Sequence, residues 1–443
     1  MRTARSPRPT PFRHAFRVGV CLFAGLLVLA ACGREGSSSS GHQWTAVVDT
    51  VADTIKVRTV SGQVWPSDAR LVSDVSIGVL DGAPEYQFGQ VRALAVDGGG
   101  NIYVLDGHGP VIRKYAPDGT YVYDIGREGE GPGEYKRPDS GLAFTPDGRL
   151  VLRDPGNGRM SIYSPDGDYQ GSWPLAGSMS TSSPLTATRS NEVLTPVIKN
   201  LGASVTEWQW GLARYHPDGT VDTLDVPDLG YEEARVSGES ENSSSMTGVP
   251  FSPQQEAVYS PLGYFVTGIS DTYSFELLRS DAPVVEISRD YEPVPVLPEE
   301  KAIRRKQITK NFEENFPGWR WNGPDIPDTK PAYRDFLVSE EGRIWVQVSL
   351  PSERTMSDAD LRAEEQRLER PVDPYEEPVA FDVFEPSGEY LGRVTAPDGF
   401  QLNPRPVIRD MDVWAVMTDD LDVARVHHFR VDVPTAEELA SGA

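Results

Sequence analysis

A repeated four-strand unit is the feature that most limits what this chain can fold into. Its clearest copy begins at Val91 and has two strands with alternating apolar residues, joined by a glycine-rich turn. A third strand follows, then a Pro-Asp-Gly turn at 117–119 and a fourth strand ending at Ile125. Alternation with a period of two predicts strands, and Pro-Asp-Gly predicts tight turns because proline presets φ and glycine accepts positive φ. This copy therefore predicts a four-stranded antiparallel sheet.

The unit recurs along the rest of the chain. Copies begin near residues 91, 140, 184, 255, 333 and 406. Four-stranded units repeated in this way are typical of a β-propeller, so we predict an all-β fold, a six-bladed β-propeller over 69–434. The last copy lacks its fourth strand, and the alternating run at 69–80 can supply it and close the ring, which would remove exposed sheet edges. A β-sandwich is the alternative, but it would not need the repeat.

Several stretches resemble a known family. The sequence from Gly98 to Tyr115 resembles an NHL-type repeat, and the segments 77–88 and 125–135 are similar to the bacterial six-bladed β-propeller lipoprotein family. The resemblance is close over 69–175 and looser beyond. It implies the fold, and it implies little about activity because that family is largely uncharacterised.

The first 31 residues have the parts of a secretory signal peptide. Five arginines and no acid come first, an apolar run covers 18–31, and the segment ends in Leu29-Ala30-Ala31 before Cys32. The apolar run is too short for a membrane span of about 20 residues. The ending resembles a bacterial lipobox, which implies cleavage before Cys32 and attachment of acyl chains such as palmitate to it. An ordinary secretory signal with an incidental cysteine is the alternative.

The residues after the signal peptide predict a tethered protein of the cell envelope. Residues 32–43 are the lipidated cysteine and a flexible tether rich in Gly and Ser, 44–68 are an N-terminal extension, and 435–443 are a C-terminal tail. Gly33 favours the outer membrane because an aspartate there would resemble an inner-membrane retention signal. We therefore expect a lipid-anchored protein, facing the periplasm or the cell surface.

Charge and cysteine content exclude several classes of function. The 443 residues carry a formal net charge of −24, which becomes −29 once the five arginines of the signal peptide are removed. A body with this charge repels nucleic acid and anionic membranes, so we expect contact with a membrane only through the lipid anchor. Only Cys21 and Cys32 are present, so we expect neither a disulfide framework nor a cysteine-based zinc site in the folded body.

The long connections are predicted to lie on one face. In a four-stranded blade, the links between strands two and three and the links between blades emerge together, and the longest of these are 126–138, 298–330 and 351–378. Long connections are often functional. We expect a basic helix over 298–316 and an exposed helix within 357–370. The candidate ligand-binding residues on this face are His108, Arg127, Tyr135, Arg137, Trp319, Arg320 and Trp321.

Two of these features have competing interpretations. The basic helix could bind an anionic partner, or its cations could balance nearby acids. The indoles of Trp319 and Trp321 could stack on a sugar or clamp a peptide, or they could pack the helix onto the ring.

The sequence contains no complete catalytic motif, and we assign no catalytic residue. His-Glu-x-x-His, Gly-x-Ser-x-Gly and Cys/His clusters are absent. Some six-bladed propellers are metal-dependent lactonases or lyases, and Asp106, Asp154 and Asn157 could hold Ca²⁺ or another divalent metal at the central channel. The alternative is that these acids hydrogen-bond the next turn.

Three functions follow from these observations. The first is a non-catalytic binding or scaffold module, without a cofactor, for a peptide, a glycan or a partner protein. The second is a divalent-metal-dependent hydrolase or lyase, similar to a lactonase, with its site at the central channel. The third is a structural member of an envelope complex, which would present a large apolar patch.

Overall fold

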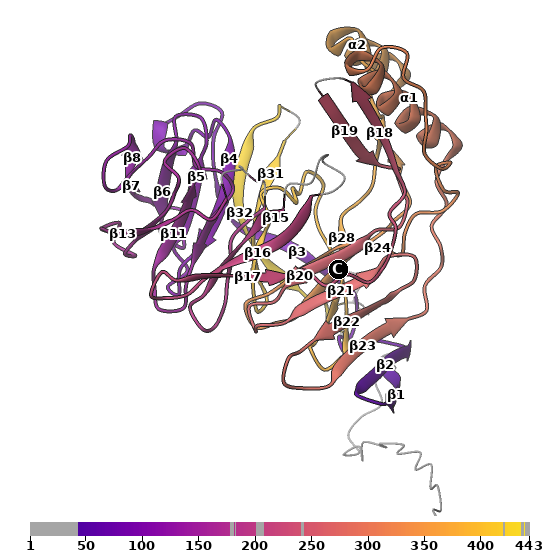
Figure 1. Ribbon diagram of the computed structural model, residues 1–443, viewed down its shortest axis with the longest axis horizontal. Helices are drawn as coiled ribbons and strands as arrows, with labels where there is room; N and C mark the ends of the chain where they lie inside the picture. The colour runs from indigo at the N-terminus through magenta and orange to yellow at the C-terminus, as the bar shows by residue number, and fades with distance from the viewer. Residues whose placement is uncertain are drawn as a thin grey trace, which may run out of the picture. The chain divides into compact units, whose positions relative to one another are not determined.

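The computed structural model describes residues 43–177, 181, 183–200, 208–240, 243–419, 421–435 and 438. The predicted signal peptide and Cys32 lie outside these residues. Strands dominate the described part of the chain (Figure 1). None of the helices within it is long and apolar enough to cross a membrane.

The first three sheets each contain four antiparallel strands in chain order. The first sheet consists of β4 (Val91–Val96), β5 (Ile102–Asp106), β6 (Val111–Tyr115) and β7 (Tyr121–Ile125); the second of β10 (Leu142–Phe144), β11 (Leu150–Asp154), β12 (Arg159–Tyr163) and β13 (Tyr169–Pro174); and the third of β14 (Thr186–Ala187), β15 (Val193–Asn200), β16 (Gln209–Tyr215) and β17 (Val221–Asp225). Three short hairpin or bridging pairs lie in the links, namely β8 (Arg127–Glu128) with β9 (Glu134–Tyr135), β18 (Arg235–Ser240) with β19 (Ser243–Gly248), and β26 (Glu353–Arg354) with β27 (Tyr375–Glu376).

The remaining strands form two larger sheets. The six-stranded sheet contains β20 (Gln255–Tyr259), β21 (Phe265–Ile269), β22 (Ser274–Leu278) and β23 (Val284–Arg289), and the hairpin of β1 (Thr45–Val51) and β2 (Thr54–Ser61) extends it. The eight-stranded sheet contains β24 (Tyr333–Val338), β25 (Ile344–Val348), β28 (Ala380–Phe384), β29 (Tyr390–Thr395), β3 (Ala69–Ile77), β32 (Ala424–Asp432), β31 (Asp412–Thr418) and β30 (Val407–Arg409). The predicted starts near 91, 140, 184, 255, 333 and 406 fall at or within two residues of β4, β10, β14, β20, β24 and β30.

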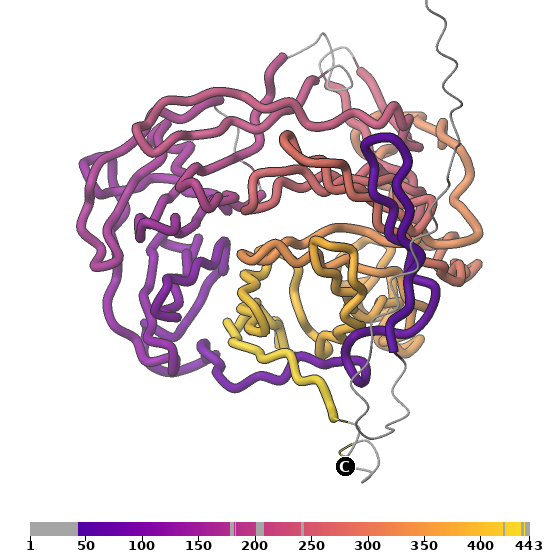
Figure 2. Tube along the Cα trace, turned by 90° about the horizontal axis from the view of Figure 1, so that it is seen from below, coloured from indigo at the N-terminus to yellow at the C-terminus, as the bar shows by residue number. Residues whose placement is uncertain are grey.

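The core lies between the faces of successive sheets. One buried cluster joins the first sheet to the second, and another joins the second to the third. Ile77 of β3 packs with residues of β4, β5, β31 and β32, so the last strands of the chain pack against the first sheet. Figure 2 shows the sheets following one another around a common centre, with the C-terminal strands beside N-terminal β3. Packing of this kind, with the last sheet returning to the first, is the arrangement of a β-propeller.

Strand β3 takes the place that the sequence indicated. It pairs antiparallel with β32, 350 or so residues away, from Arg70↔Asp432 to Ile77↔Val426. His428 of β32 lies within hydrogen-bond distance of carboxylates on both neighbours, at 2.6 Å from Asp74 and 2.9 Å from Asp412. The N-terminal extension, for which the sequence indicated no structure, is the β1–β2 hairpin, and β2 runs parallel to β23 at the outer edge of that sheet.

Two α-helices occur in the described part of the chain, both in predicted connections, besides one 3-10 turn at Pro84–Tyr86. α1 (Pro298–Asn315) begins with proline and has Glu299 and Glu300 in its first turn. Negative side chains there interact favourably with the positive end of the helix dipole. α2 (Asp358–Leu368) begins after Ser357, whose hydroxyl accepts a hydrogen bond from the backbone N–H of Asp360. Both helices agree with the ranges expected from the sequence.

Candidate functional site

The β18–β19 hairpin, α1 and α2 gather at one end of the β20–β29 region (Figure 1). An apolar cluster holds α1 to the hairpin: Phe312, Phe316 and Trp319 pack with Val236 of β18. The Trp319 Nε1–H donates to the Ser237 carbonyl oxygen at 2.7 Å. Gly238 has no room for a side chain, because a Cβ there would lie 2.5 Å from the Phe316 ring. The hairpin and α1 therefore form one packed unit.

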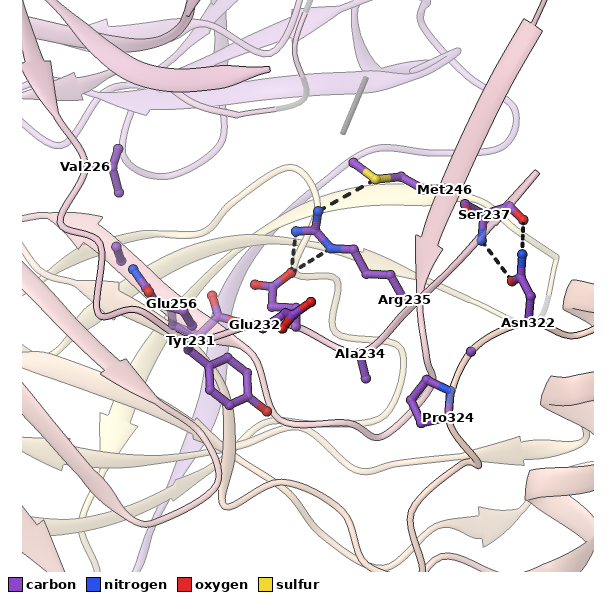
Figure 3. Close-up of a pocket in the computed structure, with 14 residues that line it drawn as sticks. Val226, Tyr231, Glu232, Ala234, Arg235, Ser237, Met246, Glu256, Asn322 and Pro324 are labelled. Carbon is purple, nitrogen blue, oxygen red and sulfur yellow. Dashed lines mark hydrogen bonds and ion pairs between the residues drawn. The ribbon is translucent and has the colours of Figure 1, made fainter. Parts of the chain in front are cut away.

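A pocket of about 950 Å³ opens beside this unit (Figure 3). We call it the hairpin pocket, because the β18–β19 hairpin forms one of its walls. The segment after β17, the first residues of β20 and the turn after Trp321 form the rest. Its lining residues are Val226, Tyr231, Glu232, Glu233, Ala234, Arg235, Ser237, Met246, Gln255, Glu256, Ala257, Asn322, Gly323 and Pro324.

Glu256 is the most perturbed acid of the hairpin pocket. Burial raises the pKa of its carboxyl group to about 8, and the nearby carboxylates of Asp335 and Glu233 add to the rise, while Arg405 opposes it. Within the described residues, its carboxylate accepts no hydrogen bond and forms no ion pair. A carboxyl group that titrates near neutral pH can hold or release a proton under physiological conditions.

The pocket carries more negative than positive charge. Its one cationic lining side chain, Arg235, pairs with Glu233 at 2.6 Å and also lies 3.6 Å from the sulfur of Met246. Figure 3 shows Arg235 and Met246 on one side, with Tyr231, Glu232 and Glu256 on the other. Glu232 is exposed and has no ion-pair partner among the described residues. Glu232 is therefore free to pair with a cationic ligand, whereas Glu256, which is protonated below a pH of about 8, would pair with a cation by releasing its proton.

The metal-ligand candidates are engaged in structural hydrogen bonds. Asp106 is buried and accepts the backbone N–H groups of Gly89, Gln90 and His108, as well as Arg113 Nη1, each at 3.0 Å. The Asp154 carboxylate accepts two further backbone N–H groups, those of residues 136 and 137. The Asn157 side-chain N–H donates to the Gly129 carbonyl oxygen at 2.9 Å. Within the described part of the chain, no group of three or more His, Cys, Asp or Glu could hold a metal ion.

The binding-face candidates near the second sheet do not line the hairpin pocket. Tyr135, a candidate ligand-binding residue, is fully buried: its hydroxyl donates to the Ile125 carbonyl at 2.8 Å and accepts from the Ile112 N–H at 2.9 Å. That expectation was wrong because the ring packs between two sheets. Arg127 is exposed and pairs with Glu134, and His108 and Arg137 are exposed.

The Trp-Arg-Trp segment packs the helix instead of presenting two free indoles. Trp319 is buried against Phe312, with ring centroids 4.7 Å apart. Trp321 Nε1–H donates to the backbone carbonyls of Gly323 and Pro324, and Arg305 lies over its ring at 4.7 Å. Arg320 is exposed. The arrangement corresponds to the packing interpretation.

The cations of α1 are all paired. This agrees with the interpretation in which they balance nearby acids. The pairs are Lys301–Asp328, Arg304–Asp373, Arg305–Asp325, Lys306–Glu365 and Lys310–Glu314.

Sequence reasoning missed the β18–β19 hairpin and Glu256. The hairpin is rich in serine and lacks the apolar alternation that marks the blade strands. A signal for Glu256 does exist in the sequence, since it is an acid placed next to the first residue of a predicted inner strand. Its surroundings come from segments around residues 233, 335 and 405, so only the folded chain brings them together.

Comparisons with known proteins provide no family assignment. No protein-family model matches the chain, and no curated protein sequence matches it. Similar solved structures include a member of the DUF4221 family from Bacteroides vulgatus (TM-score 0.49, 9% identity, covering 83% of this chain and 99% of that one). A gluconolactonase from Xanthomonas campestris matches with a TM-score of 0.36 and 13% identity, covering 83% of this chain and 92% of that one. An inactive virginiamycin B lyase from Staphylococcus aureus matches with a TM-score of 0.34 and 10% identity, covering 82% of this chain and 100% of that one. These neighbours are β-propeller proteins. At such TM-scores they establish neither relationship nor activity.

Proposed function

We propose that this protein is a lipid-anchored, six-bladed β-propeller of the bacterial cell envelope that binds a ligand without transforming it. The anchor is Cys32, and the location is the outer membrane. The ligand is a peptide, a glycan or a partner protein, and the hairpin pocket receives it.

The strand order supports a count of six blades. The eight-stranded sheet consists of two groups of four, β24-β25-β28-β29 and β30-β31-β32-β3, joined by a short parallel pairing of Val394 with Ala69 and Thr395 with Arg70. Strands β20 to β23 form a further group once the β1–β2 hairpin is set aside. With the three four-stranded sheets, this makes six groups.

Unpaired carboxylates in a large pocket carry the binding proposal. The volume of about 950 Å³ lies within the usual size range of ligand sites, about 300 to 1,000 Å³. Neither Glu232 nor Glu256 forms an ion pair with another described residue, and the Tyr231 ring and the Met246 thioether supply apolar contact area. A basic side chain of a peptide or partner protein is the group that this lining would stabilise best.

The test measures calorimetric binding of a tripeptide, acetyl-Ala-Lys-Ala-amide, to the full-length protein. We expect binding that weakens about tenfold or more in the E232Q/E256Q double variant, as the loss of a charged hydrogen-bonded pair implies. The same peptide with Nε-acetyllysine should bind equally weakly to both proteins. E353Q, which changes an exposed acid outside the pocket, is the matched control. Equal binding of the two peptides would overturn the proposal.

A hydrolase or lyase is the second candidate, and the Glu256 carboxyl group favours it. A pKa of about 8 suits a general acid or base. A divalent metal at Asp106, Asp154 and Asn157 does not fit this structure, because the carboxylates of Asp106 and Asp154 already accept backbone N–H groups. Turnover of a simple lactone by the wild type, lost in E256Q, would favour this candidate over non-catalytic binding.

A further inference from the structure

A second pocket lies between α1, the end of the β18–β19 hairpin and the strands β24 and β25. We call it the helix pocket, and its volume is about 410 Å³. Its lining residues are Thr247, Gly248, Pro250, Phe251, Glu300, Arg304, Gln307, Ile308, Arg334, Gln347, Ser352, Tyr375 and Glu377. None of them also lines the hairpin pocket.

Glu300, which borders this pocket, has a buried carboxylate oxygen that lacks a hydrogen-bond donor among the described residues. The residue is only 3% exposed, and its Oε1 accepts the Ser352 hydroxyl at 2.7 Å. Its Oε2 is buried and accepts no hydrogen bond from any described residue. Leaving a buried carboxylate oxygen without a donor is costly, so the molecule maintains this arrangement at the expense of stability.

The nearest cation cannot supply that donor. Lys330 Nζ lies 4.0 Å from Glu300 Oε1, but its three protons go to the Leu350 carbonyl, the Ser352 hydroxyl and the Glu377 carboxylate, at 2.6 to 2.8 Å. An ammonium group has three donors and no more. A molecule entering the helix pocket, which Glu300 borders, is the remaining source.

The charges around the helix pocket are balanced. Arg334 pairs with Glu377, and burial alone would raise the pKa of the Glu377 carboxyl group, but Arg334 and Lys330 hold it below its ordinary value. Arg304 pairs with Asp373 at 2.7 Å. The remaining charges, those of Lys330 and Glu300, cancel. A charged ligand would disturb this balance, whereas a neutral one would not.

The lining includes both hydrogen-bond donors and acceptors, together with aromatic rings. The Gln347 amide has no hydrogen-bond partner among the described residues, the guanidinium groups of Arg304 and Arg334 remain partly exposed, and Phe251 and Tyr375 contribute ring surface. Hydroxyl groups both donate and accept, so a polyhydroxylated ring satisfies such a lining. From these observations we infer that the helix pocket is a second binding site that accepts one neutral saccharide unit, with a sugar hydroxyl donating to Glu300.

The test uses saturation-transfer NMR and calorimetry on the full-length protein in lipid nanodiscs. The probes are the methyl glycosides of glucose, galactose and mannose, and N-acetylglucosamine, with glucuronate and glucosamine as charged counterparts. We expect at least one neutral probe to bind with a Kd in the millimolar range or tighter, and the charged counterparts to bind more weakly.

Two variants assign the binding to this pocket. E300Q keeps an acceptor for Ser352 but replaces the unpartnered oxygen by an amide donor, and Q347L removes an amide from the opposite wall without touching the Lys330 network. Each should weaken saccharide binding about tenfold or more, with the circular dichroism spectrum unchanged. E232Q, in the hairpin pocket, should leave it unaltered. The site does not depend on the peptide-binding proposal, because E232Q/E256Q tests that proposal separately.

Three outcomes would overturn the inference. One is that none of the neutral probes binds, in which case water supplies the missing donor to Glu300. Another is that both E300Q and Q347L retain wild-type affinity. The third is that glucuronate or glucosamine binds more tightly than every neutral probe.

Discussion

At the scale of single residues, Glu256 combines burial with the lack of an ion-pair partner among the described residues. Its carboxyl group lies on β20, where the first strands of neighbouring sheets contact one another, and Asp335 on β24 and Glu233 repel its ionised form. Desolvation and like charge both favour the protonated acid. Proteins tolerate such a group where function requires it, and this is why we place it in the ligand site and not in the framework.

The pH dependence of stability provides a test of this view. The folded state holds the Glu256 proton up to a pH of about 8, whereas the unfolded chain releases it near 4.5. Between these values the folded state binds more protons, so the contribution of Glu256 to the free energy of unfolding falls as pH rises, by about 1.4 kcal/mol per unit at most. E256Q removes this contribution. The free energy of unfolding of E256Q minus that of the wild type should therefore rise from pH 5 to 8 and stay constant above pH 8.

Urea unfolding at several pH values, followed by circular dichroism, measures the difference. E353Q serves as the control, because Glu353 is an exposed acid in β26, and its difference from the wild type should stay flat. A flat difference for E256Q as well would show that the carboxyl group titrates normally in the folded protein.

At the scale of secondary-structure elements, β3 closes the fold by packing in two directions. Leu71, near its start, packs with residues of β28, β29 and β32, whereas Ile77, at its end, packs with β4, β5 and β31. Both side chains are buried, at 6% and 1% exposed. One strand from the N-terminal region thus connects the final group of strands with the groups on either side.

Truncating these side chains should destabilise the whole ring. We expect L71A and I77A each to lower the free energy of unfolding by about 2 to 5 kcal/mol, as for other buried aliphatic truncations. V48A, in the β1–β2 hairpin, is the matched control: Val48 is 58% exposed, and its change should stay within about 0.5 kcal/mol. Denaturant titration gives both values. Stabilities of L71A and I77A as high as that of V48A would mean that β3 is not needed to hold the ring together.

The elements also show how far the sequence can predict this structure. Strand starts and both helices follow from local patterns, namely alternation, Pro-Asp-Gly turns, a leading proline and a run of mixed charges, and the structure has them where expected. The β1–β2 and β18–β19 hairpins do not follow, because β1 is exposed along most of its length and β18–β19 is largely serine and glycine. The two pockets are formed by connections distant in sequence, so local patterns could indicate the face but not the residues.

At the scale of the whole molecule, charge and anchoring act against each other. A body with a net charge of −29 after processing is repelled by anionic lipid surfaces. Acyl chains bind membranes with about 0.8 kcal/mol for each buried methylene, and two or more chains give a stable anchor. The proposed lipidation at Cys32 would therefore provide the whole of the attraction to the membrane.

We expect two results in bacteria fed an alkyne-tagged palmitate. The wild-type protein and C21A should incorporate the tag, because Cys21 is lost with the signal peptide, and C32A should not. A chain that starts at Gly33 behind a conventional cleavable signal should appear in the soluble fraction, and about 1 M salt should not drive it to membranes, because salt screens repulsion without creating attraction. Labelling of C32A, or membrane retention of the chain starting at Gly33, would show that something other than Cys32 holds the protein. The body would then need an apolar or basic surface of its own, and its strongly acidic composition argues against the basic one.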